Sequence, residues 1–341
     1  MIFTFKNIRL YDYLSASAAI LFVILLISGP RSCTAGTAYG LKLSAEILVP
    51  AIFPFAVPVI FLMNTALFKK SKRKILIVYI LSLLGGYPIG AKLINELQNN
   101  GDISAENAEN ILPFCVNSGP SFVILAVGNG IFDNRNIGYI LLFSHVITSF
   151  FLMLAFYRKL LFSKVADVKS NNSTPIMDNF IYSVHNASNA TLSICAFVVL
   201  FSVVGAYTES FATTAKPFSI IISLLEITTA ISKTRNVYFV SFLLGFAGFS
   251  VWMQVFAQSK TNIIRFTVIR TAHGALSAFI TALIIKIFGI ALPSLGNAVT
   301  ANVKTVNSGY LLAFSMLVMS ALLLVSISSK NHSGNLLRDM L

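Results

Sequence analysis

Long apolar stretches without Asp, Glu, Lys or Arg recur along the whole chain. Six of them exceed the roughly 18 mostly apolar residues that a bilayer crossing requires: 13–30, 47–68, 111–132, 136–157, 236–259 and 305–329. The stretch 179–208 joins them, with His185 as its only titratable residue. A single window of this kind could be a buried core helix. A series of them along one chain predicts an all-α polytopic membrane protein.

The overall composition agrees with this pattern. Only 11% of the 341 residues are charged and 56% are hydrophobic, whereas a soluble domain carries about 25% charged residues. A net charge of +13 in a soluble protein would point to nucleic acid. Here the Lys and Arg residues lie in short connections, where they orient helices. We therefore expect a multi-pass protein of the bacterial cytoplasmic membrane, with the lipid bilayer and not nucleic acid as partner.

Polar stretches divide the chain into two halves of five elements each, which predicts about 8–10 transmembrane helices. The boundaries that we expect are 1–157 for the first membrane half, 158–178 for a basic polar linker, 179–330 for the second half and 331–341 for a polar tail. The expected elements are 13–29, 45–68, 75–97, 104–132 and 136–157, then 180–208, 215–232, 236–257, 263–288 and 305–329. The sequence leaves homo-oligomerisation open.

The two halves repeat each other weakly. Residues 83–90 resemble 243–250, and residues 117–121 occupy the place of 271–275 in the second half. Paired hydrophobic segments interrupted by Gly or Pro mark binding sites in transporters. This pattern predicts an internal repeat in the two halves, with broken segments at 85–90 and 245–250.

Basic clusters orient the predicted elements. Lys69, Lys70, Lys72, Arg73 and Lys74 place the second connection on the inside of the membrane. The basic linker 158–169 falls on the same side if one broken element in each half is re-entrant, so that it enters and leaves on one side. The same scheme places these later basic residues inside: Lys233, Arg235, Lys260, Arg265 and Lys330. Parallel and inverted repeats both remain open.

The first break covers residues 85–90. Proline removes a donor and clashes with the preceding turn, and glycines loosen the backbone. Unpaired backbone groups cost several kcal/mol in hydrocarbon, on the order of a buried unsatisfied amide, so such a break persists next to protein or a polar cavity. The predicted substrate-binding residues are Gly85, Gly86, Tyr87 and Pro88, with Gly245, Gly248 and Ser250 as counterparts. The alternative is a kink or close helix packing.

A second break lies within the uncharged span 111–132. Its candidate binding residues are Asn117, Ser118, Gly119 and Ser121. A helix that starts at Pro120 would direct its positive end at whatever lies before it, which suits an anion. The alternative is that these polar side chains join helices to one another.

Charged residues inside apolar segments are the remaining candidates. An ionised carboxylate such as Glu226 costs at least roughly 2.5–3.5 kcal/mol at the bilayer centre, so it should face protein or water and couple transport to a proton or cation, with Thr228 beside it. Arg270 and His273 share a helix face and are the cationic candidates for an anionic substrate. Lys92 follows the first break. The alternative for Glu226 is an ion pair with Arg270, His273 or Lys92.

Neither a cofactor nor a metal site is expected. Cys33, Cys115 and Cys195 have no common spacing that would form a zinc or redox site. Ser118, His145, His185 and Glu226 form no recognisable catalytic constellation, so we expect no enzyme. The chain also lacks the nucleotide-binding pattern G-x-x-x-x-G-K-[ST].

Three strings of residues resemble the YlbJ-type sporulation integral membrane proteins, which carry the nucleoside-recognition or gate domain: 46–55, 85–92 and 113–120. The resemblance is densest over 45–150 and extends more loosely to 224–229 and 270–274. In the second half, Phe249-Ser250 stands in place of the Pro88-containing sequence, which departs from a clean repeat.

The resemblance implies a spore-forming bacterium and a role in sporulation, with the family linked to moving dipicolinate across the outer forespore membrane. The gate domain is shared with nucleoside carriers and ferrous-iron transport proteins. The resulting hypothesis is a secondary carrier of a small organic anion, with dipicolinate as the candidate. The alternatives are a non-transporting scaffold for spore formation and a nucleoside carrier.

Overall fold

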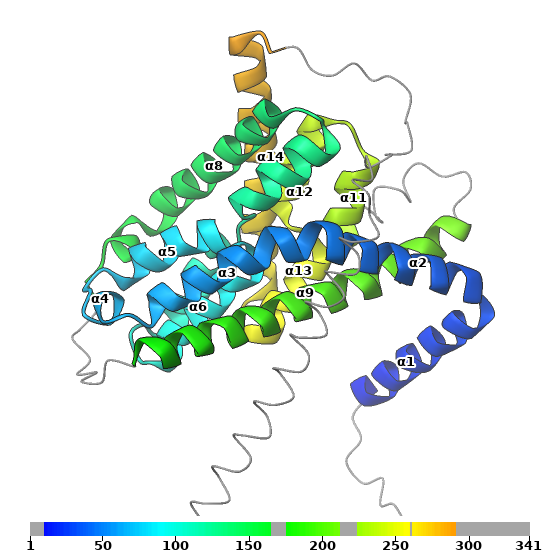
Figure 1. The fold of residues 1–341 in the computed structure, drawn as a ribbon, viewed down its shortest axis with the longest axis horizontal. Helices are drawn as coiled ribbons and strands as arrows, with labels where there is room; N and C mark the ends of the chain where they lie inside the picture. The colour runs from blue at the N-terminus through cyan, green and yellow to red at the C-terminus, as the bar shows by residue number, and fades with distance from the viewer. Residues whose placement is uncertain (1–9, 165–174, 212–223, 260, 291–341) are drawn as a thin grey trace, which may run out of the picture.

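The structure, a computed structural model, describes residues 10–164, 175–211, 224–259 and 261–290 (Figure 1). These ranges are helical, without a strand. The helices that are long and apolar enough to cross a membrane are Pro30–Met63, Arg135–Leu161, Ile176–Tyr207, Val237–Gln258 and Ile263–Phe288. The predicted all-α polytopic fold is therefore confirmed. The expected element 305–329 lies outside the described residues.

The first long span is a continuous helix with a π-helical segment in its middle. After α1 (Leu10–Ser28), the chain forms α2 (Pro30–Leu43), the π segment η1 (Ser44–Leu48) and α3 (Val49–Met63). Pro30 suits the first turn of α2, where its missing N–H is not needed. Residues 30–44, which the sequence analysis assigned to no element, are thus part of the span.

The second long helix, α9 (Ile176–Phe211), lies antiparallel to α2 and α3, and the two cross the bundle side by side (Figure 1). A Cβ on Gly36 would lie 2.6 Å from the Cα of Val203, and one on Gly40 would lie 2.7 Å from the Cα of Val199. The two glycines therefore let the backbones touch. Because α8 ends at Leu161 and α9 begins at Ile176, helices cover both ends of the predicted linker 158–178.

A helical hairpin follows the short helix α4 (Ala66–Lys69). It consists of α5 (Lys74–Gly85) and α6 (Tyr87–Asn99), with Gly86 at the tip in a left-handed conformation, φ 84°. At its base, Lys74 Nζ lies 2.5 Å from Asp102 Oδ1. The hairpin therefore enters and leaves at the same end of the bundle, as a re-entrant element in the first half would.

The next span is broken in its middle. Helix α7 (Ala105–Cys115) is capped by Ser104, whose Oγ accepts a hydrogen bond from the Asn107 N–H at 3.2 Å. Residues 116–119 are not helical, and the helix resumes at Pro120, as predicted, and continues into the π segment η2 (Phe122–Ile131). Helix α8 (Arg135–Leu161) then runs back along both parts.

The described part of the second half contains α11 (Ile227–Lys233), α12 (Val237–Phe246), α13 (Gly248–Gln258) and α14 (Ile263–Phe288). Ala247 and Gly248, with φ of 74° and 70°, separate α12 from α13. The break predicted at 245–250 is therefore present. In contrast to α5 and α6, these two helices continue as one candidate span.

The second matched pair of segments, 117–121 and 271–275, has a break in the first half alone. Residues 271–275 lie inside α14, which is helical throughout. Gly274 serves close packing instead, because a Cβ there would lie 2.7 Å from the Phe242 carbonyl oxygen, and one on Gly245 would lie 2.6 Å from the Gly274 Cα. Residues 117–121 thus have no broken counterpart in 271–275.

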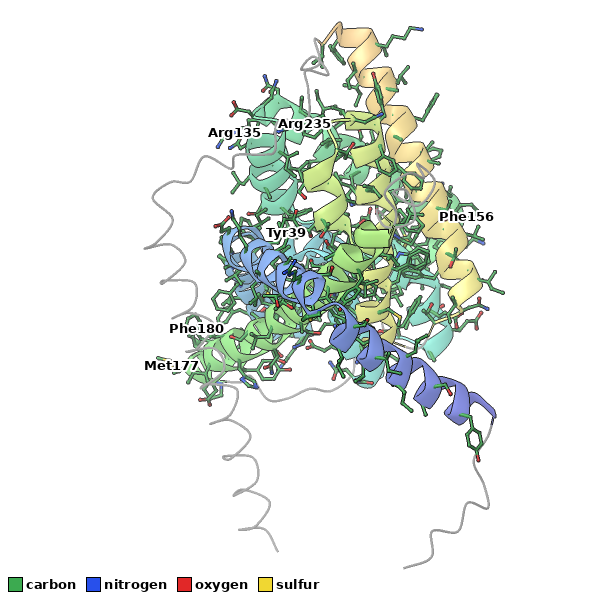
Figure 2. The ribbon with its side chains drawn as sticks, turned by 90° about the vertical axis from the view of Figure 1, so that its right-hand side faces the viewer. Tyr39, Arg135, Phe156, Met177, Phe180 and Arg235 are labelled. Atoms are coloured by element: carbon green, nitrogen blue, oxygen red, sulfur yellow. The ribbon has the colours of Figure 1, made fainter. Side chains whose placement is uncertain are left out.

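The predicted placement of Arg235 and Arg265 on one side is also wrong. Ser241 Oγ bonds Thr281 Oγ1 at 2.8 Å, so α12 starts beside the final part of α14. The Asn262 N–H, at the start of α14, donates to Glu109 Oε1 at 3.2 Å. A helix of 26 residues is roughly 39 Å long, so the two arginines lie at opposite ends of the bundle. Figure 2 shows Arg235 at the same end as Arg135.

Candidate functional site

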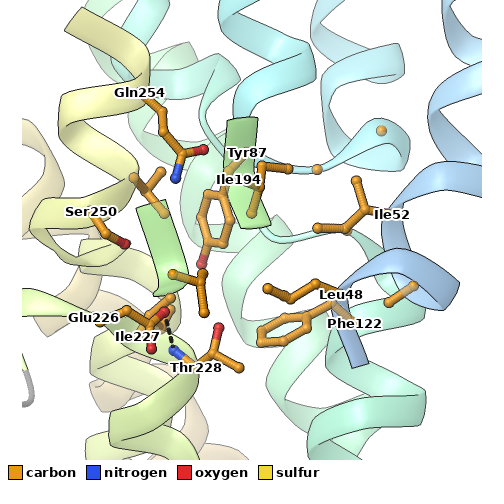
Figure 3. Close-up of a pocket in the computed structure, with 16 residues that line it drawn as sticks. Leu48, Ile52, Tyr87, Phe122, Ile194, Glu226, Ile227, Thr228, Ser250 and Gln254 are labelled. Atoms are coloured by element: carbon orange, nitrogen blue, oxygen red, sulfur yellow. Dashed lines mark hydrogen bonds between the residues drawn. The ribbon is translucent and has the colours of Figure 1, made fainter. Parts of the chain in front are cut away.

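The breaks in the helices meet around one pocket in the middle of the bundle (Figure 3). The pocket is lined by Leu48, Ala51, Ile52, Gly85, Gly86, Tyr87, Gly119, Phe122, Ile194, Val198, Glu226, Ile227, Thr228, Ser250, Val251 and Gln254. Among the predicted binding residues, it brings together Gly85, Gly86, Tyr87, Gly119, Glu226, Thr228 and Ser250. Segments far apart in the sequence therefore form a single site.

The tip of the α5–α6 hairpin touches the break after α7. A Cβ on Gly86 would lie 3.5 Å from the Gly119 nitrogen, and one on Gly119 would lie 3.5 Å from the Gly86 Cα. The positive φ of Gly86 also favours glycine, because other residues pay a steric cost there. These two glycines bring two backbones together at the edge of the pocket.

Tyr87 joins three elements at this point. Its hydroxyl donates to the Leu244 carbonyl oxygen of α12 at 3.0 Å and accepts a hydrogen bond from Ser118 Oγ. The hairpin, the break after α7 and the end of α12 are thus held together by one side chain. Ser118 itself does not line the pocket.

Glu226 is the acidic group of the pocket and caps α11. Its two carboxylate oxygens accept hydrogen bonds from the Thr228 and Thr229 N–H groups at 2.8 and 2.5 Å. The side chain is buried, and no ion pair with Arg270, His273 or Lys92 is found in the described part of the chain. The first helical turn, and not a basic side chain, therefore stabilises this carboxylate.

Four helical segments begin at the pocket. Pocket-lining residues lie at or within three residues of the N-terminus of α6, η2, α11 and α13, namely Tyr87, Phe122, Ile227 and Ser250. Helix N-termini carry partial positive charge and N–H groups without a partner inside the helix. At α11, Glu226 already accepts from the Thr228 and Thr229 N–H groups. Broken helices that direct such ends at a midplane site bind anionic substrate groups in several transporters.

The pocket has a polar wall and an apolar wall, which face each other in Figure 3. Glu226 precedes α11, and Ser250 and Gln254 belong to α13. Leu48, Ile52 and Phe122 lie opposite, joined by Ile194 and Val198 of α9. The π segments η1 and η2 both reach this apolar wall. Such irregularities are frequent at functional sites.

Arg270 and His273 form a separate buried cluster outside the pocket. Arg270 Nη1 donates to the Pro113 carbonyl oxygen at 3.1 Å and lies 3.1 Å from His273 Nδ1. The ring of His273 stacks on His145 with centroids 4.6 Å apart, and His145 Nε2 accepts from the Ser118 N–H at 3.1 Å. This cluster contacts the break after α7 on a side that does not line the pocket.

The other predicted residues lie around the pocket without lining it. Lys92 bonds Asn186 of α9, and Asn117 Nδ2 donates to the Phe114 carbonyl oxygen at 2.5 Å. A Cβ on Gly248 would lie 3.2 Å from the Ile227 nitrogen. Pro88 lies in the first turn of α6, Gly245 packs on Gly274, and Ser121 is buried at the start of η2.

Sequence reasoning missed Gln254 and the apolar wall. Gln254 is a polar residue inside the uncharged window 236–259, four residues after Ser250 and hence on the same helix face, so this signal was present. The apolar wall resembles any other lipid-facing or core segment in the sequence. The described residues contain no cluster of three or more His, Cys, Asp or Glu side chains suited to a metal ion.

Comparison with known proteins bears on the family. No protein-family profile matches the chain, and no solved structure is similar to it. The chain is 25% identical to the sporulation integral membrane protein YlbJ of Bacillus subtilis (strain 168), over 82% of this chain and 84% of that protein. The resemblance seen in the motifs is thus confirmed, and the chain is an integral membrane protein related to the YlbJ-type sporulation proteins.

Proposed function

We propose that the protein is a secondary carrier of a small organic anion in the cytoplasmic or forespore membrane of a sporulating bacterium. The observation that carries this proposal is the meeting of four helical N-termini at one buried pocket between the two ends of the bundle. Irregular backbone in a membrane is stable only next to protein or a polar cavity, so the breaks serve the pocket. Dipicolinate, which the family resemblance implies, is the first substrate to test.

Glu226 gives the carrier a coupling group. An ionised carboxylate in the pocket repels an anionic substrate, and a proton on Glu226 removes that repulsion. Binding of the anion and of one proton would then favour each other. We therefore expect cotransport of the anion with a proton, driven by a pH gradient.

The pocket is narrow in the described structure. The cavity has a volume of about 30 Å³, while a single water molecule needs about 10–15 Å³ by the same measure. An organic anion does not fit until the walls separate. Transport thus requires a movement of the hairpin or of the apolar wall, as in carriers whose halves rock around a fixed site.

The test is uptake by the purified protein in liposomes. Labelled dipicolinate should accumulate when the side from which it enters is more acidic, and collapse of the pH gradient should stop accumulation. A thermal-shift screen with dipicolinate, nucleosides and metal ions should show stabilisation by the anion. A folded, reconstituted protein that moves none of these compounds would favour a scaffold, and stabilisation by nucleosides alone would favour a nucleoside carrier.

A further inference from the structure

Gln254 is a buried amide without a hydrogen-bond partner among the described residues. Its side chain is 1% exposed, and neither its Nε2 nor its Oε1 bonds any described group. Leaving such a group unsatisfied costs about 1–3 kcal/mol. A buried polar group that stays unsatisfied therefore needs an explanation, such as a ligand that bonds to it.

Ser250 shares this property and lies one turn earlier on α13. Its hydroxyl is buried and has no partner among the described residues. Figure 3 shows Ser250 and Gln254 both on the polar side of the pocket, opposite Leu48 and Ile52. The free polar atoms of both side chains thus belong to the wall of one cavity.

We propose that Gln254 and Ser250 bind the polar edge of the transported molecule. This inference rests on the proposed carrier function and names its ligands. The Gln254 amide offers two donors and an acceptor, and the Ser250 hydroxyl offers one donor. Together they can donate to the two oxygens of a carboxylate while the apolar wall covers the carbon skeleton.

Neutral donors suit this position better than a basic side chain. A carrier must release its substrate, and an ionised Arg in a buried site would hold a carboxylate by a strong charge-assisted pair. Arg270 lies in the separate cluster behind the break. The pocket therefore recognises a molecule with an apolar face and one acidic edge through amide, hydroxyl and helix-end donors.

The variant Gln254→Leu separates a binding role from a structural one. An amide that has no partner in the substrate-free protein can be replaced by an apolar group of similar size without loss of stability. An amide with a structural partner cannot. We expect the KM for dipicolinate uptake to rise about tenfold or more, the effect of one or two lost hydrogen bonds. The thermal unfolding midpoint without substrate should stay unchanged or rise.

Gln258→Leu, one turn further along α13 and outside the pocket, is the matched control and should keep its KM. Ser250→Ala should raise KM by a smaller factor. An unchanged KM in Gln254→Leu, or a lowered unfolding midpoint without substrate, would overturn the inference.

If the wild-type protein transports nothing, the carrier function fails but the ligand role is still decided by binding. Dipicolinate should then raise the unfolding midpoint of the wild type and not that of Gln254→Leu. An equal shift in both proteins, or none in the wild type, would overturn the ligand role as well.

Discussion

Lys74 Nζ lies 2.5 Å from Asp102 Oδ1, and this contact ties the first residue of α5 to the connection that follows α6. The two side chains are 8% and 2% exposed, so each charge depends on the other. The pair fixes the base of the hairpin, while the tip at Gly86 reaches the pocket.

Removal of one member of this pair should destabilise the protein. Breaking a buried ion pair leaves an uncompensated charge and costs about 3–5 kcal/mol, whereas replacing both partners by apolar groups is often neutral. Lys74→Met and Asp102→Leu should each lower the thermal unfolding midpoint in detergent, and the double variant should unfold above both. Lys70→Met, an exposed neighbour, is the control. Additive losses in the double variant would contradict a direct pair.

Ser71 and Lys164 should lie on the cytoplasmic face. The hairpin base and the start of α7 lie at one end of the bundle, and Tyr157, near the end of α8, bonds Asn110 of α7 at 3.4 Å. Single cysteines at 71 and 164, in a protein lacking the three native cysteines, should react with an impermeant reagent only after the membrane is opened. Cysteines at Arg135 and Arg235, at the opposite end (Figure 2), should react in intact cells. The reverse pattern would refute this orientation.

Glu226→Gln should reduce uptake and remove its pH dependence. The amide keeps the volume and one acceptor oxygen but cannot exchange a proton, so the anion would no longer be coupled to the pH gradient. Glu226→Ala should in addition lose the cap of α11, which costs about 1 kcal/mol of stability. The measurement is uptake across a range of pH values, with the amount of reconstituted protein held equal. An unchanged pH profile in Glu226→Gln would exclude the coupling role.

Arg270→Lys and Arg270→Gln should both weaken substrate binding, with Gln the more severe. Arg270 holds the Pro113 carbonyl oxygen next to the break, and only Arg supplies a planar set of several donors. Because Arg270 and Glu226 form no ion pair in the described structure, the double variant Arg270→Gln with Glu226→Gln should be no better than its worse parent. Recovery of uptake in the double variant would show that the two charges balance each other in another state.

Gly90→Ala should disturb the contact between α6 and the end of α7. A Cβ at position 90 would lie 1.7 Å from the Cys115 carbonyl oxygen, so the helices must separate, and overpacking of this kind costs about 1–3 kcal/mol. Uptake and the unfolding midpoint should fall together. Gly130→Ala, where the nearest atom is 3.5 Å away, should have little effect. A fully active, stable Gly90→Ala protein would contradict the close approach.

The sequence was informative where local chemistry interrupts an apolar segment. Gly, Pro and polar residues at 85–90, 117–121 and 245–250 predicted breaks that are all present. These residues destabilise a regular helix, and the unpaired backbone groups of a break are costly in hydrocarbon unless protein or a polar cavity covers them. The sequence also matched 117–121 with 271–275, which lies in a regular helix. A glycine there meets the neighbouring α12, and close helix packing and chain reversal require the same residue type.

The rest of the site depends on contacts between distant segments. Ile194 of α9 and Leu48 of η1 line the pocket, but each resembles dozens of other apolar residues in the chain. Arg270 stood out as a charge in an apolar segment, yet only the packing against Pro113 and His273 shows that it lies outside the pocket. The two halves 1–157 and 179–330 and their relation by a repeat remain predictions.

Glu226 has two places in the structure, as a lining residue of the pocket and as the cap of α11. Its carboxylate faces the cavity and at the same time holds the first N–H groups of α11. A proton that neutralises this carboxylate weakens its hydrogen bonds to that helix end, because the charged form is the better acceptor. Protonation of the site and release of the backbone beside it would then be a single event. No further residues would be needed to transmit the change from the pocket to α11.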